Sequence, residues 1–114
     1  MIIEAEIIQY LIAKGIANGN VYAERPETLP NSYVLVQKTG SGRANHICQA
    51  MVAIQSVTNG TLLEAAQLNE AVKEAILNMP DETEIFGVRL NSDYNYTNTN
   101  TKERRYQAVF DFYY

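Results

Sequence analysis

The sequence has very few of the side chains that enzymes use for chemistry. It contains one cysteine, Cys48, one histidine, His46, and no tryptophan. A single cysteine cannot form a disulfide within the chain, which is typical of proteins from a reducing compartment. A structural or catalytic metal centre needs three or four clustered ligands, so one histidine and one cysteine cannot supply it. We therefore predict no metal and no disulfide.

The chain also lacks an excess of basic residues and any long apolar run. Nine Lys and Arg stand against 13 Asp and Glu, for a formal net charge of −4. Nucleic-acid-binding domains usually carry clustered positive charge, so stable binding to a duplex is not expected. No apolar stretch approaches the length of a membrane span, and the N-terminal residues lack the basic segment of a signal peptide. We expect no contact with a membrane.

What is present indicates an ordinary globular domain. The 114 residues are 46% hydrophobic and 19% charged, which argues against disorder. This length is enough for one hydrophobic core, so we predict a single domain over residues 1–114.

Hydrophobic periodicity predicts the order of the elements. Apolar residues at helical spacing predict helices over 2–18 and 61–79, the second opened by the capping residues Thr61 and Glu64. Alternating or continuous apolar residues predict strands over 21–23, 32–38, 44–57, 84–92 and 105–113. A flexible turn is expected at residues 40–42. We predict an α+β fold, a mainly antiparallel sheet of four to five strands with two helices packed on one face, in the order α-β-β-β-α-β-β.

The strand predicted over 44–57 is too long for a domain of this size. About 12 extended residues span roughly 40 Å, whereas a compact chain of this length is only about 34 Å across. The strand must therefore bend strongly or project as part of a hairpin. A projecting hairpin offers unpaired strand edges to a partner.

Two groups of polar residues near the C-terminus have both a structural and a functional interpretation. Tyr94 and Tyr96 lie in a polar stretch that is predicted as a loop over 92–104. A protein interface or a plain surface loop explains these tyrosines better than base stacking does. Arg89, Arg104 and Arg105 either pair with acidic side chains of the second helix or reach acids on another subunit.

Residues 61–84 carry six acids and one basic residue, Lys73. This acidic face is either solvated or docks onto a basic patch of a neighbouring protein.

No pattern in the chain predicts catalysis. His46 and Cys48 share one face of a predicted strand, where neighbours lie about 6.5–7 Å apart, too far for a nucleophile–base pair. Cys48 is expected to be a buried structural thiol. The glycines before Arg43 lack the Gly-Lys-Ser/Thr ending of a phosphate-binding loop and precede a strand. We predict no enzymatic activity, no catalytic residue and no cofactor.

Several short segments resemble one protein family over nearly the whole chain. They are an amphipathic first helix, the segments 21–26 and 29–36, a long strand of small residues, a helix with Ala66, Asn69, Val72, Ala75 and Ile76, and the closing segment 105–112. This pattern is similar to the tail terminator proteins, also called tail completion or minor tail or capsid proteins, of long-tailed bacteriophages and prophages. Members of that family form rings, commonly hexamers, that cap the tail tube and join it to the head.

The resemblance implies a structural role in the virion neck, after assembly in the host cytoplasm. The implied partners are further copies of the chain, the tail tube protein and the head connector protein, and DNA would pass through the lumen without specific binding. The subunit-interface candidates are Arg43, Asn45, Gln49, Arg89, Tyr94, Tyr96, Arg104 and Arg105. Two alternatives stay open, a head-side connector or stopper of the same neck, and a small regulatory domain that binds a ligand or a protein.

Overall fold

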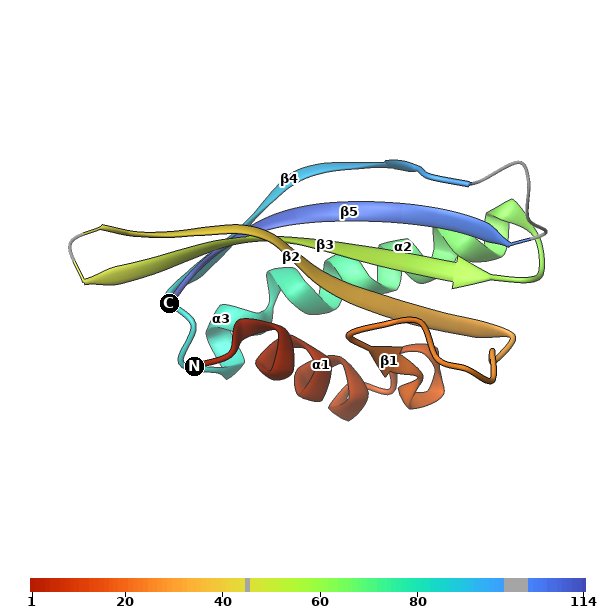
Figure 1. The fold of residues 1–114 in the computed structure, drawn as a ribbon, viewed down its shortest axis with the longest axis horizontal. Helices are drawn as coiled ribbons and strands as arrows, with labels where there is room; N and C mark the ends of the chain where they lie inside the picture. The colour runs from red at the N-terminus through yellow and green to blue at the C-terminus, as the bar shows by residue number, and fades with distance from the viewer. Residues whose placement is uncertain (45, 98–102) are drawn as a thin grey trace.

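The chain forms one five-stranded sheet covered on one face by helices (Figure 1). The computed structural model describes residues 1–44, 46–97 and 103–114. The strands are ordered β1-β2-β3-β5-β4, and only β1 and β2 are parallel neighbours. The predicted fold class and element order are confirmed, with two short helical segments added. The strands are β1 (Val21–Tyr22), β2 (Ser32–Ala44), β3 (Ile47–Thr58), β4 (Gly87–Asn95) and β5 (Arg104–Tyr113); the helices are α1 (Ile3–Ala13), η1 (Ile16–Gly19), α2 (Leu62–Leu77) and α3 (Met79–Glu82).

Helix α1 is shorter than its apolar spacing predicts. Its buried stripe consists of Ile3, Ile7 and Leu11, but the helix ends at Ala13, not at residue 18. Gly15 takes a φ of 74°, a left-handed conformation that glycine adopts without strain and that ends an α-helix. The chain then makes the 3-10 turn η1. Ile12 follows the apolar spacing of the helix predicted over 2–18, but its side chain is exposed.

Helix α2 begins at the predicted cap. The Thr61 hydroxyl accepts a hydrogen bond from the backbone N–H of Glu64 at 3.2 Å, which satisfies one of the unpaired donors of the first turn. Val72 and Ile76 are fully buried against the sheet. The helix was expected to end at Pro80-Asp81. Instead it ends at Leu77, and Pro80 lies in the first turn of α3, where a missing N–H costs nothing.

The β2–β3 hairpin is longer than predicted and reverses at a different place. The expected turn at Gly40-Ser41-Gly42 is wrong, because these residues pair with Met51, Ala50 and Gln49 of β3. β2 continues to Ala44, and β3 begins at Ile47 rather than at residue 44. The molecule measures 44 × 25 × 24 Å, and the end of the hairpin projects from it (Figure 1). The predicted projection of the long strand is therefore confirmed.

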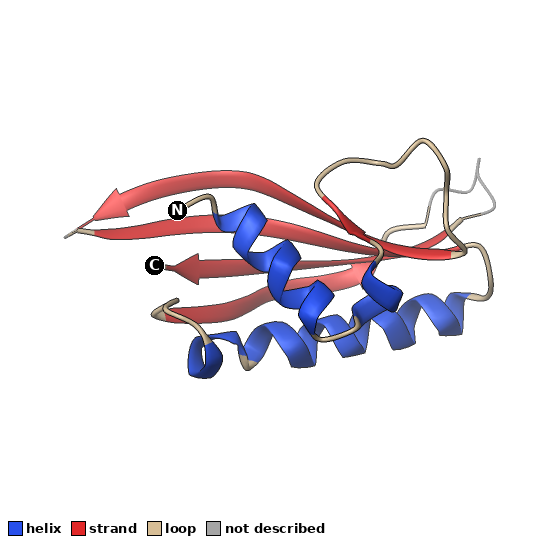
Figure 2. Cartoon of the chain, turned by 90° about the horizontal axis from the view of Figure 1, so that it is seen from below, coloured by secondary structure: helices blue, strands red, loops and turns tan. Residues whose placement is uncertain are grey.

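The main core lies between the sheet and the two long helices, which lie on the same side of it (Figure 2). Val52 and Ile54 of β3 and Phe110 and Phe112 of β5 are fully buried there. The two phenylalanine rings are 6.0 Å apart. The alternating apolar pattern of the strand predicted over 84–92 would bury Phe86, but its side chain is 73% exposed and precedes β4.

Strand β4 extends into the segment that was predicted to be a loop. It continues to Asn95 and pairs with β5 as far as Tyr106. The pairing skips Asn91, which forms a bulge between Leu90 and Ser92. The predicted loop over 92–104 is therefore wrong in its first residues.

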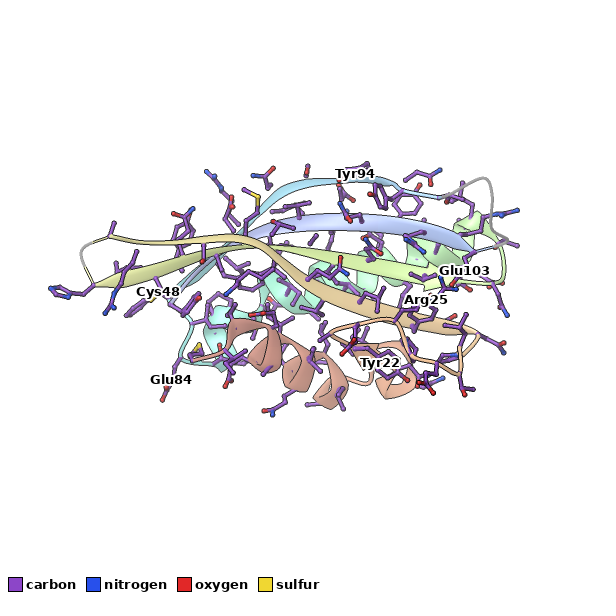
Figure 3. The ribbon with its side chains drawn as sticks, in the orientation of Figure 1. Tyr22, Arg25, Cys48, Glu84, Tyr94 and Glu103 are labelled. Atoms are coloured by element: carbon purple, nitrogen blue, oxygen red, sulfur yellow. The ribbon has the colours of Figure 1, made fainter. Side chains whose placement is uncertain are left out.

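A second, smaller apolar cluster lies on the opposite face of the sheet. Tyr33, Leu35 and Val57 are buried there and pack with Tyr22. The Tyr33 hydroxyl donates to Glu103 Oε2 at 2.5 Å, and Arg25 donates to Glu103 Oε1 at 2.8 Å. Figure 3 shows Arg25 and Glu103 at the same end of the molecule. Glu103 thereby ties the β1–β2 connection and β2 to the start of β5.

Substitution of Val72 tests the predicted core stripe of α2. We expect Val72→Asp to unfold the protein, because it places an unpaired carboxylate in a fully buried site. Ala71→Asp is the matched control, since residue 71 is exposed on the same helix. Circular dichroism during thermal unfolding measures whether each of the two variants is folded and how stable it is. A folded Val72→Asp variant as stable as the control would show that this face is not core.

The Glu103 contacts make a second prediction. Burial and the hydrogen bond to Glu103 raise the pKa of Tyr33 to about 12 from 10.0. The neutral hydroxyl therefore stabilises the fold fully below pH 10, and this contribution is lost as the pH rises to about 12. We expect Glu103→Gln to lower the free energy of unfolding by about 1 kcal/mol and to lower the pKa of Tyr33.

Urea unfolding and the absorbance of ionised tyrosine measure these two effects. Glu84→Gln is the control, because Glu84 is an exposed carboxylate. An unchanged stability and an unchanged alkaline titration in Glu103→Gln would show that the contact contributes nothing.

Candidate assembly surface

The predicted interface residues lie at the two ends of the sheet and along β4. Arg43 and Gln49 lie near the end of the hairpin, opposite Cys48 and Gly42 in the neighbouring strand. Both are exposed. Asn45 falls outside the described residues. The remaining candidates lie on β4, just after it, or at the start of β5.

Two glycines leave a hollow on one face of the hairpin. Gly40 is opposite Met51 and Gly42 is opposite Gln49, and no atom lies within 4 Å of a Cβ built at either glycine. The resulting hollow has a volume of about 430 Å³ and is lined also by Thr39 and Ser41. Met51 and Ile47 are exposed beside it. The hairpin therefore presents a shallow, partly apolar surface near its end.

His46 and Cys48 do not form a reactive pair in this hairpin. His46 lies in the reversal with a φ of 67°, and Cys48 lies on β3, paired through its backbone with Tyr114 at 2.8 and 2.9 Å. The Cys48 side chain is half-buried rather than fully buried as predicted. Over residues 1–44, 46–97 and 103–114, no group of three His, Cys, Asp or Glu side chains could hold a metal.

Tyr94 and Tyr96 are held by the sheet. Their rings meet edge to face with centroids 5.9 Å apart. Gln107 of β5 donates from Nε2 to the Tyr94 hydroxyl at 2.5 Å, and the Tyr96 backbone N–H donates to the Arg105 carbonyl at 2.8 Å. Figure 3 shows Tyr94 along the margin formed by β4. Both side chains are more than 40% exposed, so they form a fixed aromatic pair available for contact.

Arg89 pairs with a residue of the sheet rather than with α2. It donates to Asp111 Oδ2 at 3.2 Å, and Asn91 Nδ2 lies 3.4 Å from the same oxygen. Asp111 is buried, whereas the Arg89 side chain is 71% exposed. The other carboxylate oxygen, Oδ1, has no hydrogen-bond partner among the described residues. Of the two interpretations of Arg89, pairing with acids of the second helix is therefore not found, because its described partner is Asp111 of β5. Sequence reasoning did not identify Asp111, because its partners lie on another strand.

Arg104 and Arg105 open β5, opposite Thr58 and Val57 of β3. Both are half-buried. The Arg105 Nε is buried without a hydrogen-bond partner among the described residues. The Thr97 hydroxyl accepts from the Arg105 backbone N–H at 3.0 Å. The two guanidinium groups therefore belong to the same end of the sheet as Tyr94 and Tyr96, away from Arg43.

Helix α2 is joined to β4 by a different ion pair. Lys73 Nζ lies 2.7 Å from Asp93 Oδ2 and 2.6 Å from Glu70, and Asn69 Nδ2 donates to Asp93 at 3.1 Å. The hydrogen bonds to Asp93 and Glu70 raise the pKa of Lys73. This contact fixes β4 over the acidic helix.

Charge is separated across the molecule. The hairpin strands, with the residues that join them, carry Lys38 and Arg43 and no acid between residues 32 and 58. Helices α2 and α3 and the residues after them carry the excess of acids, with Glu70, Glu74 and Glu84 exposed. Glu82 contacts Lys14 at 2.7 Å, and the hydrogen bond from Lys14 lowers its pKa. The described molecule therefore has a basic hairpin and an acidic helical side.

No helix in the described parts of the chain is long and apolar enough to cross a membrane.

Comparison with known proteins identifies the fold. No protein-family model and no curated protein sequence matches the chain. A chain in the solved structure of the virion of a native gene transfer agent particle is similar, with a TM-score of 0.76 and 19% identity. The match covers 96% of this chain and 92% of that chain. The two chains therefore share one fold over almost their full lengths.

Proposed function

We propose that the protein is a structural component of a phage-like virion, and that its copies form a ring that caps the tail tube and joins the tail to the head. The observation that carries this proposal is the near full-length likeness to a chain of a gene transfer agent virion. The tail terminator resemblance of the sequence supports the same role. A non-enzymatic role agrees with both.

The distribution of surface features supports a head-to-tail ring. The basic hairpin and the acidic helical side are different surfaces at different places on one subunit. Contacts between two different surfaces of identical subunits generate a ring when the rotation closes. Such a ring, possessing net negative charge, would let DNA pass through its lumen without binding it specifically. Its other partners would be the tail tube protein and the head connector protein.

The open hollows of the described residues do not favour the small-ligand alternative. The hollow between α1 and α2 is open, has a volume of about 250 Å³, and has three charged side chains, Lys14, Glu74 and Glu82, among its eight lining residues. Ligand pockets are usually enclosed and mostly apolar, with few polar groups. A head-side connector or stopper ring is the second candidate, because it would use the same kind of subunit contact within the same neck.

Purified tail tubes test the proposal. We expect the protein to bind tube ends as a hexameric ring, because a tube template presents several equivalent sites at once. Sedimentation and electron microscopy of the mixture measure this, with tailless heads as the comparison. Binding to heads but not to tubes would select the head-side connector. A protein that stays monomeric at high concentration and leaves tube ends uncapped would contradict the ring.

Arg104 provides a more specific prediction. We expect Arg104→Glu to leave the thermal unfolding temperature within a few degrees of the original, but to weaken assembly on tubes, because it reverses a charge at the end of the sheet. Arg104→Lys, which keeps the charge, is the control and should assemble. If Arg104→Glu instead unfolds the monomer, Arg104 is a structural residue and does not belong to the interface.

A further inference from the structure

We propose that neighbouring copies join by extending the β-sheet, with the open edge of β2 in one copy paired antiparallel to the open edge of β4 in the next. The inference rests on the proposed ring and specifies the contact that builds it. Each edge strand of a sheet carries unpaired N–H and C=O groups that another strand can use. The sheet order leaves two such edges, one at each margin.

The open part of β2 begins where β1 ends. β1 pairs only with Val34 and Leu35, so no strand of the described residues lies beside residues 36–44 on that side. Val34 directs its N–H away from β3, to Asn20. Alternation along the strand then directs the backbone groups of Val36 and Lys38 to the open side. Beyond the bulge at Thr39, Arg43 is paired with Cys48, whose backbone N–H points away from β2, to Tyr114. The backbone groups of Arg43, and by alternation those of Ser41, therefore also point to the open side.

The open edge of β4 has the same construction. The Tyr96 N–H reaches the Arg105 carbonyl, which places Asn95 and Tyr106 in a pair that does not exchange hydrogen bonds. Asn95 and Asp93 therefore direct their backbone groups away from β5. Beyond the bulge at Asn91, the register with β5 directs Leu90 and Val88 outward in the same way. β4 is nine residues long, and residues 36–44 of β2 match that length.

The two edges match in spacing and direction. On each edge, two outward-facing residues precede a bulge and two follow it. The bulges arise because the pairing with the inner strand skips Thr39 in β2 and Asn91 in β4. β2, β3, β5 and β4 alternate in direction. A neighbour placed beside β2 in the same orientation therefore offers its β4 antiparallel, with its helices on the same face. One register then aligns all outward groups: Val36 with Asn95, Lys38 with Asp93, Ser41 with Leu90 and Arg43 with Val88.

Charge complementarity favours a second copy of the chain as the partner that pairs with the open edge of β2. Lys38 of one copy would lie opposite Asp93 of the next, on the same face of the extended sheet. The charged side chains of the hairpin strands, Lys38 and Arg43, are both basic, whereas Asp93 lies on β4 at the other margin of the sheet. Opposite charges across strands stabilise pairing, whereas two β2 edges would place like charges together. The contact therefore favours head-to-tail addition over a symmetric dimer.

A proline at Ser41 tests the use of the β2 edge. Ser41 directs its N–H outward, so Ser41→Pro removes a donor from the edge without removing a bond to β3. We expect Ser41→Pro to raise the concentration needed for ring formation on tubes about tenfold or more. The control, Ser41→Ala, keeps the N–H and should assemble normally. Equal assembly of both variants would overturn the edge contact.

A disulfide cross-link tests the proposed register independently. It also tests the pairing of the β2 and β4 edges if the Ser41→Pro variant does not fold. In the proposed register Gln37 lies opposite Tyr94 of the next copy, close enough for a disulfide. In a Cys48→Ser background, we expect Gln37→Cys with Tyr94→Cys to form a ladder of covalent oligomers on oxidation in the presence of tubes. Gln37→Cys with Asn95→Cys is the control, because its side chains point to opposite faces and should not cross-link.

The outcomes separate this inference from the proposed function. If the original protein forms rings but Ser41→Pro assembles normally and Gln37→Cys with Tyr94→Cys gives no covalent ladder, the ring stands and the edge contact is wrong. If the original protein forms no ring on tubes or heads, the proposed function itself is wrong.

Discussion

The pairing of β3 with β2 on one side and β5 on the other is the constraint on which the rest of the structure depends. Alternate residues of β3 face the helices, as Val52 and Ile54 do, or the opposite face, as Ala53 and Gln55 do. A slip of one residue would exchange the two faces and expose the core. The same register determines where the bulges fall and therefore which backbone groups of β2 and β4 reach the margins of the sheet.

The sequence predicts this architecture because its strongest patterns are local. The alternation in β5 and the stripe containing Val72 and Ile76 in α2 each show one buried face. The wrong predictions arise where the local sequence shows no alternation between buried and exposed residues. Gly40 and Gly42 have no side chains to show alternation, so a strand resembled a turn, although a strand tolerates glycine where another surface approaches. Phe86 follows the apolar pattern, yet lies outside the core.

The candidate site was predictable in part for the same reason. Exposed basic and aromatic residues such as Arg43 and Tyr94 are recognisable from composition and placement. The contacts of Tyr33 with Glu103, and of Arg89 with Asp111, join residues far apart in the sequence and depend on strand order. The matching edges depend on bulges, which become visible only in the register between strands. Together these features describe a sheet whose open strand edges, β2 and β4, lie at its two margins, where the proposed ring contact would use them.

Hydrogen exchange on the ring assembled at tube ends tests the central claim most directly. We expect the amides of Val36, Lys38, Ser41 and Arg43, and those of Leu90 and Asp93, to exchange rapidly in the monomer and slowly in the ring, because pairing satisfies them. Protection confined to the loops, with both strand edges exchanging as fast in the ring as in the monomer, would contradict a sheet that continues from one copy to the next.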